Sequence, residues 1–490
     1  MNDLKGKGIQ AFIWDFLGKL GTHASSFIVT IILARILEPS DFGLIAIIMV
    51  IVSLATIFSD IGLGGALIQR KRLHQIHYSS VFFFNISAGF ILTVITFLSA
   101  NWVGEFYNNE ELTPVLQVTS LLFVISAFHA VQTVVLKREL KYDILTKVNL
   151  IASIASGVIG VALAFCGAGV WSLVVQLISR EIIINIVIWS KTSWVPKIAF
   201  SLKALKQLWS YGMNMFLAEV LDTIYEKADY LIIGKLFTPV TLGFFHQAKQ
   251  LNNFVIEYSA GSLMSVLFPV LSKIQNDLVK FQRVVLKSTG IISFVTFLLL
   301  GGLYLVADEV IILLLSEKWT PSVFYFKIIL LSGFAYPISA LMVNVLSSRG
   351  KSKDFLRLEI YKKIIQTGNF YILYAFGIQV FLYSLVVSSL LGTALNIRFA
   401  TREIDIPFLS IVRPLMVQAI ITVALVMAIL MAINDLQLPS FIMMLIKGFA
   451  FLFAYIAVNW VLHIKSFEII KEQLESILVI FKKRRSEKLA

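Results

Sequence analysis

Long apolar runs separated by short polar segments dominate the pattern along the chain. A helix that crosses the roughly 30 Å hydrocarbon layer of a bilayer needs about 20 mostly apolar residues. Eleven runs meet this requirement clearly, and three more (211–236, 244–271 and 358–376) are long enough but carry several charges. The pattern therefore predicts fourteen spans: 14–36, 42–63, 81–102, 115–136, 148–165, 170–189, 211–236, 244–271, 291–306, 323–346, 358–376, 380–400, 415–433 and 441–463.

The basic residues alternate between successive loops. Of the 42 Lys and Arg residues, 33 lie in loops or at span ends on the N-terminal side, three in loops or at span ends on the opposite side, and six deeper inside spans. Short cytoplasmic loops of membrane proteins collect Lys and Arg. We therefore expect a multi-pass protein with both termini in the cytoplasm.

The composition agrees with this topology and narrows the function. The chain is 58% hydrophobic and 14% charged, far from the composition of a soluble enzyme. The net charge of +13 is explained by the cytoplasmic loops, so it does not indicate a nucleic-acid partner. The six His residues lie without ligand spacing and no hydrolase motif is present, which predicts no metal site, no cofactor and no enzyme.

Short matching motifs indicate an internal repeat. Pro39 and Gly43 after the first span recur as Pro239 and Gly243 after the seventh. A second pair of matches reads WSLVV at 171–175 and YSLVV at 383–387. Six spans separate the copies, so the halves have the same orientation, as in transporters with parallel repeats.

The predicted fold is an all-α polytopic membrane protein of about fourteen helices, with two parallel six-helix repeats and two additional C-terminal helices. The division is an N-terminal lobe at 1–200, a C-terminal lobe at 201–405, two extra helices at 406–463 and a basic amphipathic cytoplasmic tail at 464–490. Apolar residues at helical spacing in the tail suit either the anionic inner leaflet or packing on the loops.

Ionisable groups inside spans are the candidate functional residues, because such groups are costly in lipid unless they face water or a partner. In the first span, Asp15, Lys19 and His23 share one face. In the seventh span, four carboxylates lie within an arc of about 80°: Glu219, Asp222, Glu226 and Asp229. We expect these two stripes to line a hydrated cavity between the halves, with buried structural ion pairs as the alternative.

Basic residues inside spans are candidates for binding an anion. Lys19 and Arg180 lie deepest, and we expect them to act as anion ligands or as partners of the span-seven carboxylates. Lys227 and Lys249 join them as candidate substrate ligands nearer the outer surface. Lys327 and Lys447 are expected to extend to the surface instead. The span-seven carboxylates are candidate sites for a coupling ion, H⁺ or Na⁺.

Several longer motifs, in order along the first 400 residues, resemble the bacterial polysaccharide-transport flippases of the Wzx type. The motifs are Ile31–Gly43, Asp60–Lys71, Phe106–Pro114, Lys137–Tyr142, Gly234–Pro239 and Ser316–Trp319. That branch is similar to colanic-acid and teichuronic-acid exporters and belongs to the superfamily of lipid II flippases and multidrug antiporters.

The resemblance implies a transporter in the bacterial cytoplasmic (inner) membrane that works by alternating access. It would move undecaprenyl-pyrophosphate-linked oligosaccharide repeat units for cell-surface polysaccharide such as lipopolysaccharide or exopolysaccharide, with basic cavity residues holding the pyrophosphate and ion antiport driving transport. Membrane lipids, a polysaccharide polymerase and glycosyltransferases are candidate partners. Span seven is more acidic than expected beside an anionic headgroup. Its carboxylates would therefore serve ion coupling or neutralise the Lys residues.

Two other functions remain open from the sequence. An ion-coupled multidrug or small-cation antiporter of the same architecture would suit the acidic stripe, although fourteen spans count against it. A membrane glycan polymerase or ligase would need a large outer loop, and the outer loops here are short.

Overall fold

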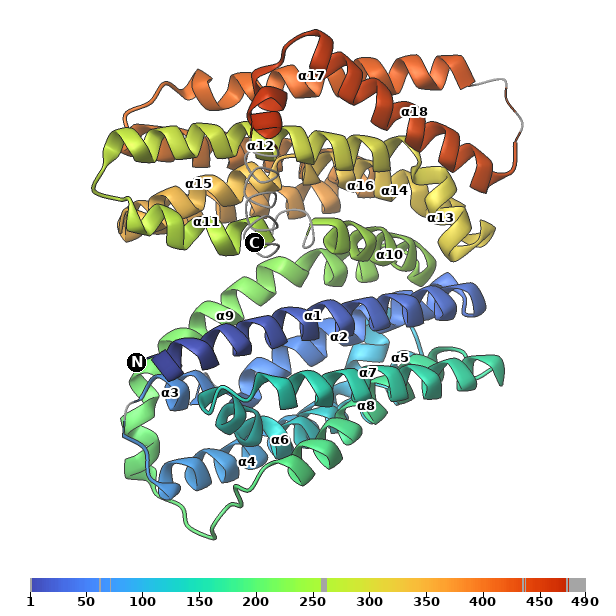
Figure 1. Ribbon diagram of the computed structural model, residues 1–490. Helices are drawn as coiled ribbons and strands as arrows, with labels where there is room; N and C mark the ends of the chain where they lie inside the picture. The colour runs from blue at the N-terminus through green and yellow to red at the C-terminus, as the bar shows by residue number, and fades with distance from the viewer. Residues whose placement is uncertain are drawn as a thin grey trace, which may run out of the picture. The chain divides into compact units, whose positions relative to one another are not determined.

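The computed structural model describes residues 2–60, 63–70, 72–256, 262–433, 436, 438–472 and 475, which are helical over most of their length (Figure 1). The chain forms two compact units, Met1–His246 and Gln247–Ala490. The helices up to the first unit's end are α1 (Asn2–Ile36), α2 (Pro39–Asp60), α3 (Leu63–Gln69), α4 (Gln75–Tyr107), α5 (Leu112–Thr119), α6 (Leu121–Arg138), α7 (Tyr142–Phe165), α8 (Val170–Lys191), α9 (Leu202–Leu236) and the start of α10 (Pro239–Ile256). The second unit continues with α11 (Ser262–Lys273), α12 (Leu278–Leu305), α13 (Ala307–Leu315), a 3₁₀ helix (Glu317–Trp319), α14 (Thr320–Gly333), α15 (Tyr336–Ser348), α16 (Ser352–Glu403), α17 (Phe408–Ile433) and α18 (Ser440–Val461).

The membrane character of the chain is confirmed. Ten helical segments among the described residues are long and apolar enough to cross a bilayer. Each of the fourteen predicted spans overlaps a helix, so the chain is an all-α polytopic membrane protein. The count of fourteen, the parallel repeat and the four-part division of the chain stay predictions.

Helix α16 is too long for one crossing and is interrupted in the middle. Its 52 residues contain one non-helical position, Gly377, with φ 81° and ψ 178°. An L side chain rarely adopts this backbone conformation, which glycine adopts readily. The break falls between the predicted spans 358–376 and 380–400, where a change of direction is needed.

Helix α7 packs along both α1 and α8 in the first unit. Small polar side chains join α1 to α7: the hydroxyls of Ser25 and Ser153 are 2.6 Å apart, and Thr146 Oγ1 donates to the Trp14 carbonyl at 2.8 Å. Small residues let two membrane helices approach closely, and interhelical hydrogen bonds then hold them. The packed face leaves Lys19 exposed.

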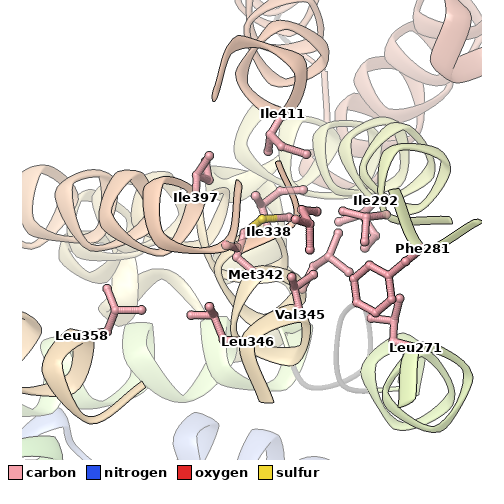
Figure 2. Packing of buried hydrophobic residues seen from close by; sticks show 14 residues of the cluster. Leu271, Phe281, Ile292, Ile338, Met342, Val345, Leu346, Leu358, Ile397 and Ile411 are labelled. Atoms are coloured by element: carbon pink, nitrogen blue, oxygen red, sulfur yellow. The ribbon is translucent and has the colours of Figure 1, made fainter. Parts of the chain in front are cut away.

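The core of the second unit forms where α12, α15 and α16 meet α11 and α17. Figure 2 shows this cluster of buried hydrophobic side chains. Phe281 of α12, Ile338 and Val345 of α15 and Ile411 of α17 are all fully buried. These apolar contacts fix the helices of the unit to one another, and the packed core extends as far as α17.

A buried polar network attaches α17 and α18 to α12. The Tyr455 hydroxyl donates to the Phe294 carbonyl at 3.0 Å and lies 2.6 Å from Gln418 Oε1. Gln418 Nε2 donates to Asn459 Oδ1 at 2.8 Å, and none of these three side chains is exposed. Such groups need internal partners because the bilayer offers none. The two extra C-terminal helices are therefore an integral part of the second unit.

The prediction that Lys327 and Lys447 extend to the surface is wrong for Lys447. Its ammonium pairs with Glu309 of α13, and the side chains are only 13% and 8% exposed. Lys327 pairs with the neighbouring Asp308. The acidic segment after α12 folds into α13 rather than remaining an open outer loop, which brings both carboxylates to the lysines.

The start of the tail packs on the second unit. Residues 465–472 are helical, Ile469 is nearly buried, and the Phe467 ring lies 5.8 Å from the Phe294 ring of α12. This contact favours packing on the protein for these first turns. Residue 475 is described, but the rest of the tail from 473, including the basic run, lies outside the described residues.

Candidate functional site

The acidic and basic groups predicted in the first span form an ion pair. Lys19 Nζ lies 2.8 Å from Asp15 Oδ2, one turn apart on α1. The two side chains are 67% and 35% exposed, so they lie on the outer surface of the first unit's helices. An exposed pair of this kind contributes at most about 1 kcal/mol. Lys19 is thus available to exchange its partner for another anion.

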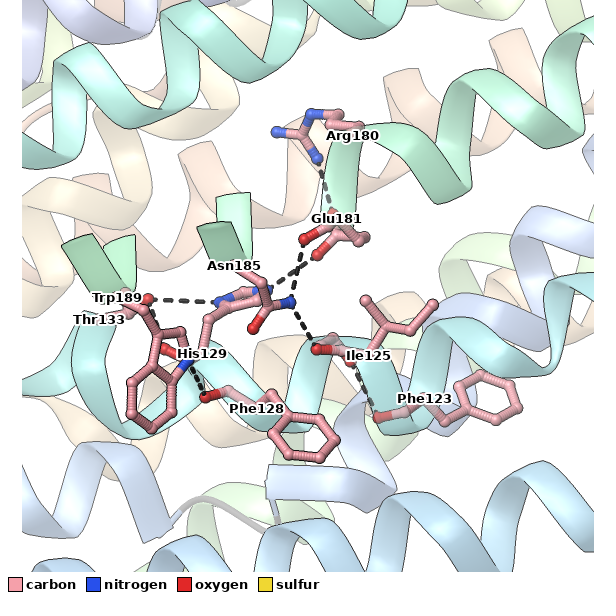
Figure 3. A network of polar contacts seen from close by, with 10 residues as sticks. Phe123, Ile125, Phe128, His129, Thr133, Arg180, Glu181, Asn185 and Trp189 are labelled. Carbon is pink, nitrogen blue, oxygen red and sulfur yellow. Dashed lines mark hydrogen bonds and ion pairs between the residues drawn. The ribbon is translucent and has the colours of Figure 1, made fainter. Parts of the chain in front are cut away.

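Arg180 belongs to a polar network between α6 and α8 (Figure 3). Its NH1 lies 3.2 Å from Glu181 Oε1, and the other carboxylate oxygen lies 2.9 Å from His129 Nε2. Asn185 Nδ2 donates to the Ile125 carbonyl at 2.8 Å, and Trp189 Nε1 donates to the α6 backbone as well. The network holds α8 to α6 and fixes Glu181 in place.

Arg180 itself keeps binding capacity. Its side chain is 37% exposed, whereas Glu181 and His129 are about half as exposed. A guanidinium carries five N–H donors in a fixed plane, and the Glu181 contact uses one side of it. The remaining donors suit a phosphate oxygen pair. The geometry gives a partly exposed guanidinium held in position by a less exposed carboxylate.

The four carboxylates predicted on the seventh span lie on α9, and their surroundings differ. Glu219, Asp222 and Glu226 are exposed, while Asp229 is 6% exposed and its Oδ1 accepts from the Tyr230 backbone N–H at 2.9 Å. Glu226 pairs with Lys227 at 2.7 Å, and the Lys227 ammonium lies 5.9 Å from the Tyr230 ring. The stripe is thus exposed at its start and buried at its end.

Lys249 is half-buried on α10, in the residues of the second unit. Lys19, Arg180 and Lys227 all lie in the first unit. The described residues contain no group of three or more His, Cys, Asp or Glu able to hold a metal ion. The roles of the four basic residues in binding substrate, and of the four carboxylates in binding a coupling ion, stay predictions.

His129 is the member of the Arg180 network that sequence reasoning missed. None of the six His residues has ligand spacing, so no motif marks His129. His129 lies in an apolar span, one turn before Thr133, whose hydroxyl donates to the His129 carbonyl at 3.0 Å. A lone imidazole in such a span is itself a signal of a polar partner. Its partner on α8 is 52 residues away, beyond any local pattern.

The repeated Pro and Gly motif brings its two copies together. A Cβ built on Gly43 at the start of α2 would lie 1.9 Å from the Pro239 carbonyl oxygen, and one built on Gly243 would lie 1.9 Å from the Pro39 carbonyl oxygen. The two helix starts therefore touch through their backbones, in a reciprocal arrangement. No residue but glycine fits at either position.

Two solved structures share this fold. One is a lipid II flippase, MurJ, in an inward closed conformation: it has a TM-score of 0.73 and 14% identity, and the match covers 92% of this chain and 99% of the other. The second is a multidrug resistance MATE family transporter in an inward-facing conformation, with a TM-score of 0.62, 15% identity and coverage of 78% and 94%. The chain therefore shares its fold with two membrane transport proteins.

The family follows from the sequence match. The model of the polysaccharide biosynthesis protein family matches residues 32–324, and the chain belongs to this family. ExoT of Rhizobium meliloti, a succinoglycan biosynthesis transport protein, is 24% identical over 62% of both chains. WzxC of Escherichia coli, a lipopolysaccharide biosynthesis protein, is 21% identical over 74% of both. The resemblance drawn from the motifs is confirmed, and the class is a transporter rather than an enzyme.

Proposed function

We propose that this protein is a flippase that moves undecaprenyl-pyrophosphate-linked oligosaccharide repeat units from the inner to the outer leaflet of the bacterial cytoplasmic membrane. The observation that carries the proposal is the family match, supported by a fold shared with a lipid II flippase over 92% of the chain. The glycan lipid would then be used to build cell-surface polysaccharide. Both termini lie in the cytoplasm in this proposal, as the loop charges predict.

The chemistry of the spans supports this substrate. A pyrophosphate cannot cross hydrocarbon unaided, because transferring an unpaired anion from water into an apolar medium is prohibitively costly. Arg180 and Lys19 offer half-exposed or exposed cations within membrane helices. In our proposal they replace part of the headgroup's hydration while the polyprenyl tail stays in lipid. Lys227 and Lys249 are further ligands of the headgroup in this proposal.

The test is the sidedness of the glycan lipid in cells that lack the protein. We expect lipid-linked repeat units to accumulate on the cytoplasmic side, inaccessible to a membrane-impermeant glycan reagent. Wild type should restore outward exposure. Lys19→Ala combined with Arg180→Ala should reduce it at least tenfold, since each lost charge-assisted contact is worth about 1.5–3 kcal/mol.

Lys287→Ala provides the matched control, because Lys287 is exposed on α12 at the end that the loop charges place in the cytoplasm. It should restore exposure fully. Normal outward exposure without the protein would refute the flippase proposal, and the multidrug antiporter would replace it. Full rescue by the double variant would refute only the assignment of these two residues.

We propose that the α9 carboxylates bind the coupling ion, H⁺ or Na⁺. Asp229 is the strongest candidate, because it is buried on a helix whose other carboxylates are exposed. Asp229→Asn should uncouple export from the ion gradient, leaving a slow rate that no longer responds to dissipation of the proton or sodium gradient. Glu219→Gln, at the exposed start of the stripe, is the comparison. An unchanged gradient response in Asp229→Asn would assign coupling elsewhere.

A further inference from the structure

A basic groove lies in the first unit where the chain enters α4 and α9. Its volume is about 440 Å³. Three permanently charged side chains line it, Arg70, Arg72 and Lys203, together with His74 and His77. None of the lining residues is acidic. A cavity that gathers three cations without a carboxylate has a strong preference for an anion.

The floor of the groove is held rigidly by Gln207 of α9. Arg70 NH2 donates to Gln207 Oε1 at 2.6 Å, and its NH1 donates to the Gln207 carbonyl at 3.2 Å. His77 Nε2 lies 3.2 Å from the same Oε1, while His77 Nδ1 accepts from the His74 backbone N–H. His77 is 6% exposed. The Arg70 guanidinium is therefore fixed in place before any ligand arrives.

The wall of the groove is also preorganised. The connector between α8 and α9 is tied to the first turns of α4: Lys197 N–H donates to Ser79 Oγ at 3.0 Å, and Ser201 N–H donates to Ser80 Oγ at 2.9 Å. Ser201 then caps α9 by accepting from the Ala204 N–H. The amino ends of two long helices thus border the groove, and their dipoles add to the positive potential.

Two of the cations lining the groove have no partner in the part of the chain that the structure describes. Within the described residues, Arg72 and Lys203 form neither an ion pair nor a side-chain hydrogen bond, and both are exposed. Arg70 donates one hydrogen bond from NH1 and one from NH2 to Gln207, which leaves three of its five N–H donors for a ligand. These free donors, arranged around a fixed Arg70, match the several oxygens of a phosphate group.

The surroundings place this groove at the level of lipid headgroups. Trp194, in the connector, lies 5.9 Å from the Phe82 ring and 6.1 Å from the Tyr78 ring of α4, and its Nε1 donates to Gln75 Oε1. Trp189, at the end of α8, joins the same cluster. Tryptophan and tyrosine gather at the interface between hydrocarbon and water. The groove lies at the end of the unit that the loop charges predict to be cytoplasmic.

We propose that this groove binds the phosphate group of a lipid in the cytoplasmic leaflet. The bound headgroup contacts Arg70, Arg72 and Lys203 while its acyl or polyprenyl chains run along the apolar surface. Two lipids supply this chemistry: an anionic phospholipid such as phosphatidylglycerol, or a polyprenyl phosphate. The groove shares no residue with the intramembrane charges described above, so the proposal does not depend on the flippase function.

The experiment compares lipid retention by purified full-length protein in native mass spectrometry. The probes are phosphatidylglycerol, undecaprenyl phosphate and zwitterionic phosphatidylethanolamine, each added separately. The test variant is Arg72→Gln with Lys203→Gln, which removes two free cations and no described protein contact. We expect affinity for the binding lipid to fall about thirty-fold, as for two cations near an anionic headgroup. Phosphatidylethanolamine retention should not change.

Lys206→Gln is the matched control, because Lys206 is exposed on the same helix but does not line the groove. It should retain lipid like wild type. A loss for phosphatidylglycerol alone identifies a phospholipid site, a loss for undecaprenyl phosphate alone identifies a site for a polyprenyl carrier, and a loss for both identifies a general phosphate site. Unchanged retention of both anionic lipids, or an equal loss in Lys206→Gln, would overturn the proposal.

Discussion

Gly43→Ala is expected to abolish export and to lower the melting temperature of the protein. The added methyl group would lie 1.9 Å from the Pro239 carbonyl oxygen and 2.7 Å from its carbonyl carbon. A backbone carbonyl cannot rotate aside as a side chain can, so the starts of α2 and α10 must separate. Overpacking at a tight contact costs about 1–3 kcal/mol, and a backbone obstruction belongs at the upper end.

Gly243→Ala should have the same effect, because its methyl group meets the Pro39 carbonyl oxygen at the same 1.9 Å. Either substitution alone separates the starts of α2 and α10, so the second meets no further obstruction. The double variant should therefore be little worse than either single variant, a departure from additivity that distant sites do not show. Melting of the detergent-solubilised protein and cellular exposure of the glycan lipid measure the two consequences separately.

Gly368→Ala and Gly448→Ala provide matched controls in α16 and α18. A Cβ at either position meets nothing within 4 Å. In a helix, alanine is favoured over glycine by about 1 kcal/mol, so these variants should be neutral or slightly more stable. Retention of full export and stability by Gly43→Ala would show that the α2 and α10 contact is not required.

Lys447→Met is expected to cause the largest loss of stability in the second unit. The substitution leaves Glu309, whose side chain is 8% exposed, without the ammonium that compensates it. Breaking a buried ion pair on one side costs about 3–5 kcal/mol, because an uncompensated charge stays buried or must take up a proton. Thermal unfolding should reveal this loss as a melting temperature several degrees lower.

A double variant separates the effect of the lost charge from the effect of changed packing. Glu309→Gln with Lys447→Met removes both charges at similar volume and should recover most of the lost stability. Lys327→Met is the exposed counterpart: its partner Asp308 has a side chain 47% exposed, so the cost should be under about 1 kcal/mol. If Lys447→Met melts like Lys327→Met, the buried pair does not stabilise the unit.

The spans were predictable because the free energy of placing a segment in lipid depends only on the residues of that segment. A run of about 20 apolar residues is favourable in lipid wherever it lies in the chain, and even the break at Gly377 falls between two predicted spans. The partners of charged residues were not predictable in this way. Lys447 and Glu309 are 138 residues apart, and His129 and Glu181 are 52 apart.

The candidate site was predictable in part for the same reason. Spacing along α9 correctly identified four carboxylates on one helix, but the burial of Asp229 alone depends on neighbouring helices. The Pro and Gly motif was recognised as a repeat, but no pattern indicated that the copies touch each other. In the sequence, Arg72 and Lys203 indicate only the charge of their loops. The groove that they line could not be predicted, because its shape depends on the folded connector.

The reciprocal contact of Gly43 and Gly243 can form only late in the synthesis of the first unit. The two positions are separated by about 200 residues, which a bacterial ribosome translates in ~10–40 s at about 5–20 residues per second. When synthesis reaches residue 200, α1 to α8 are complete, while α2 still lacks its contacts with α9 and the start of α10. The first unit is thus completed only when its last helices are made. In a nascent chain stalled near residue 200, the hydrophobic face of α2 would stay uncovered and could bind another membrane helix.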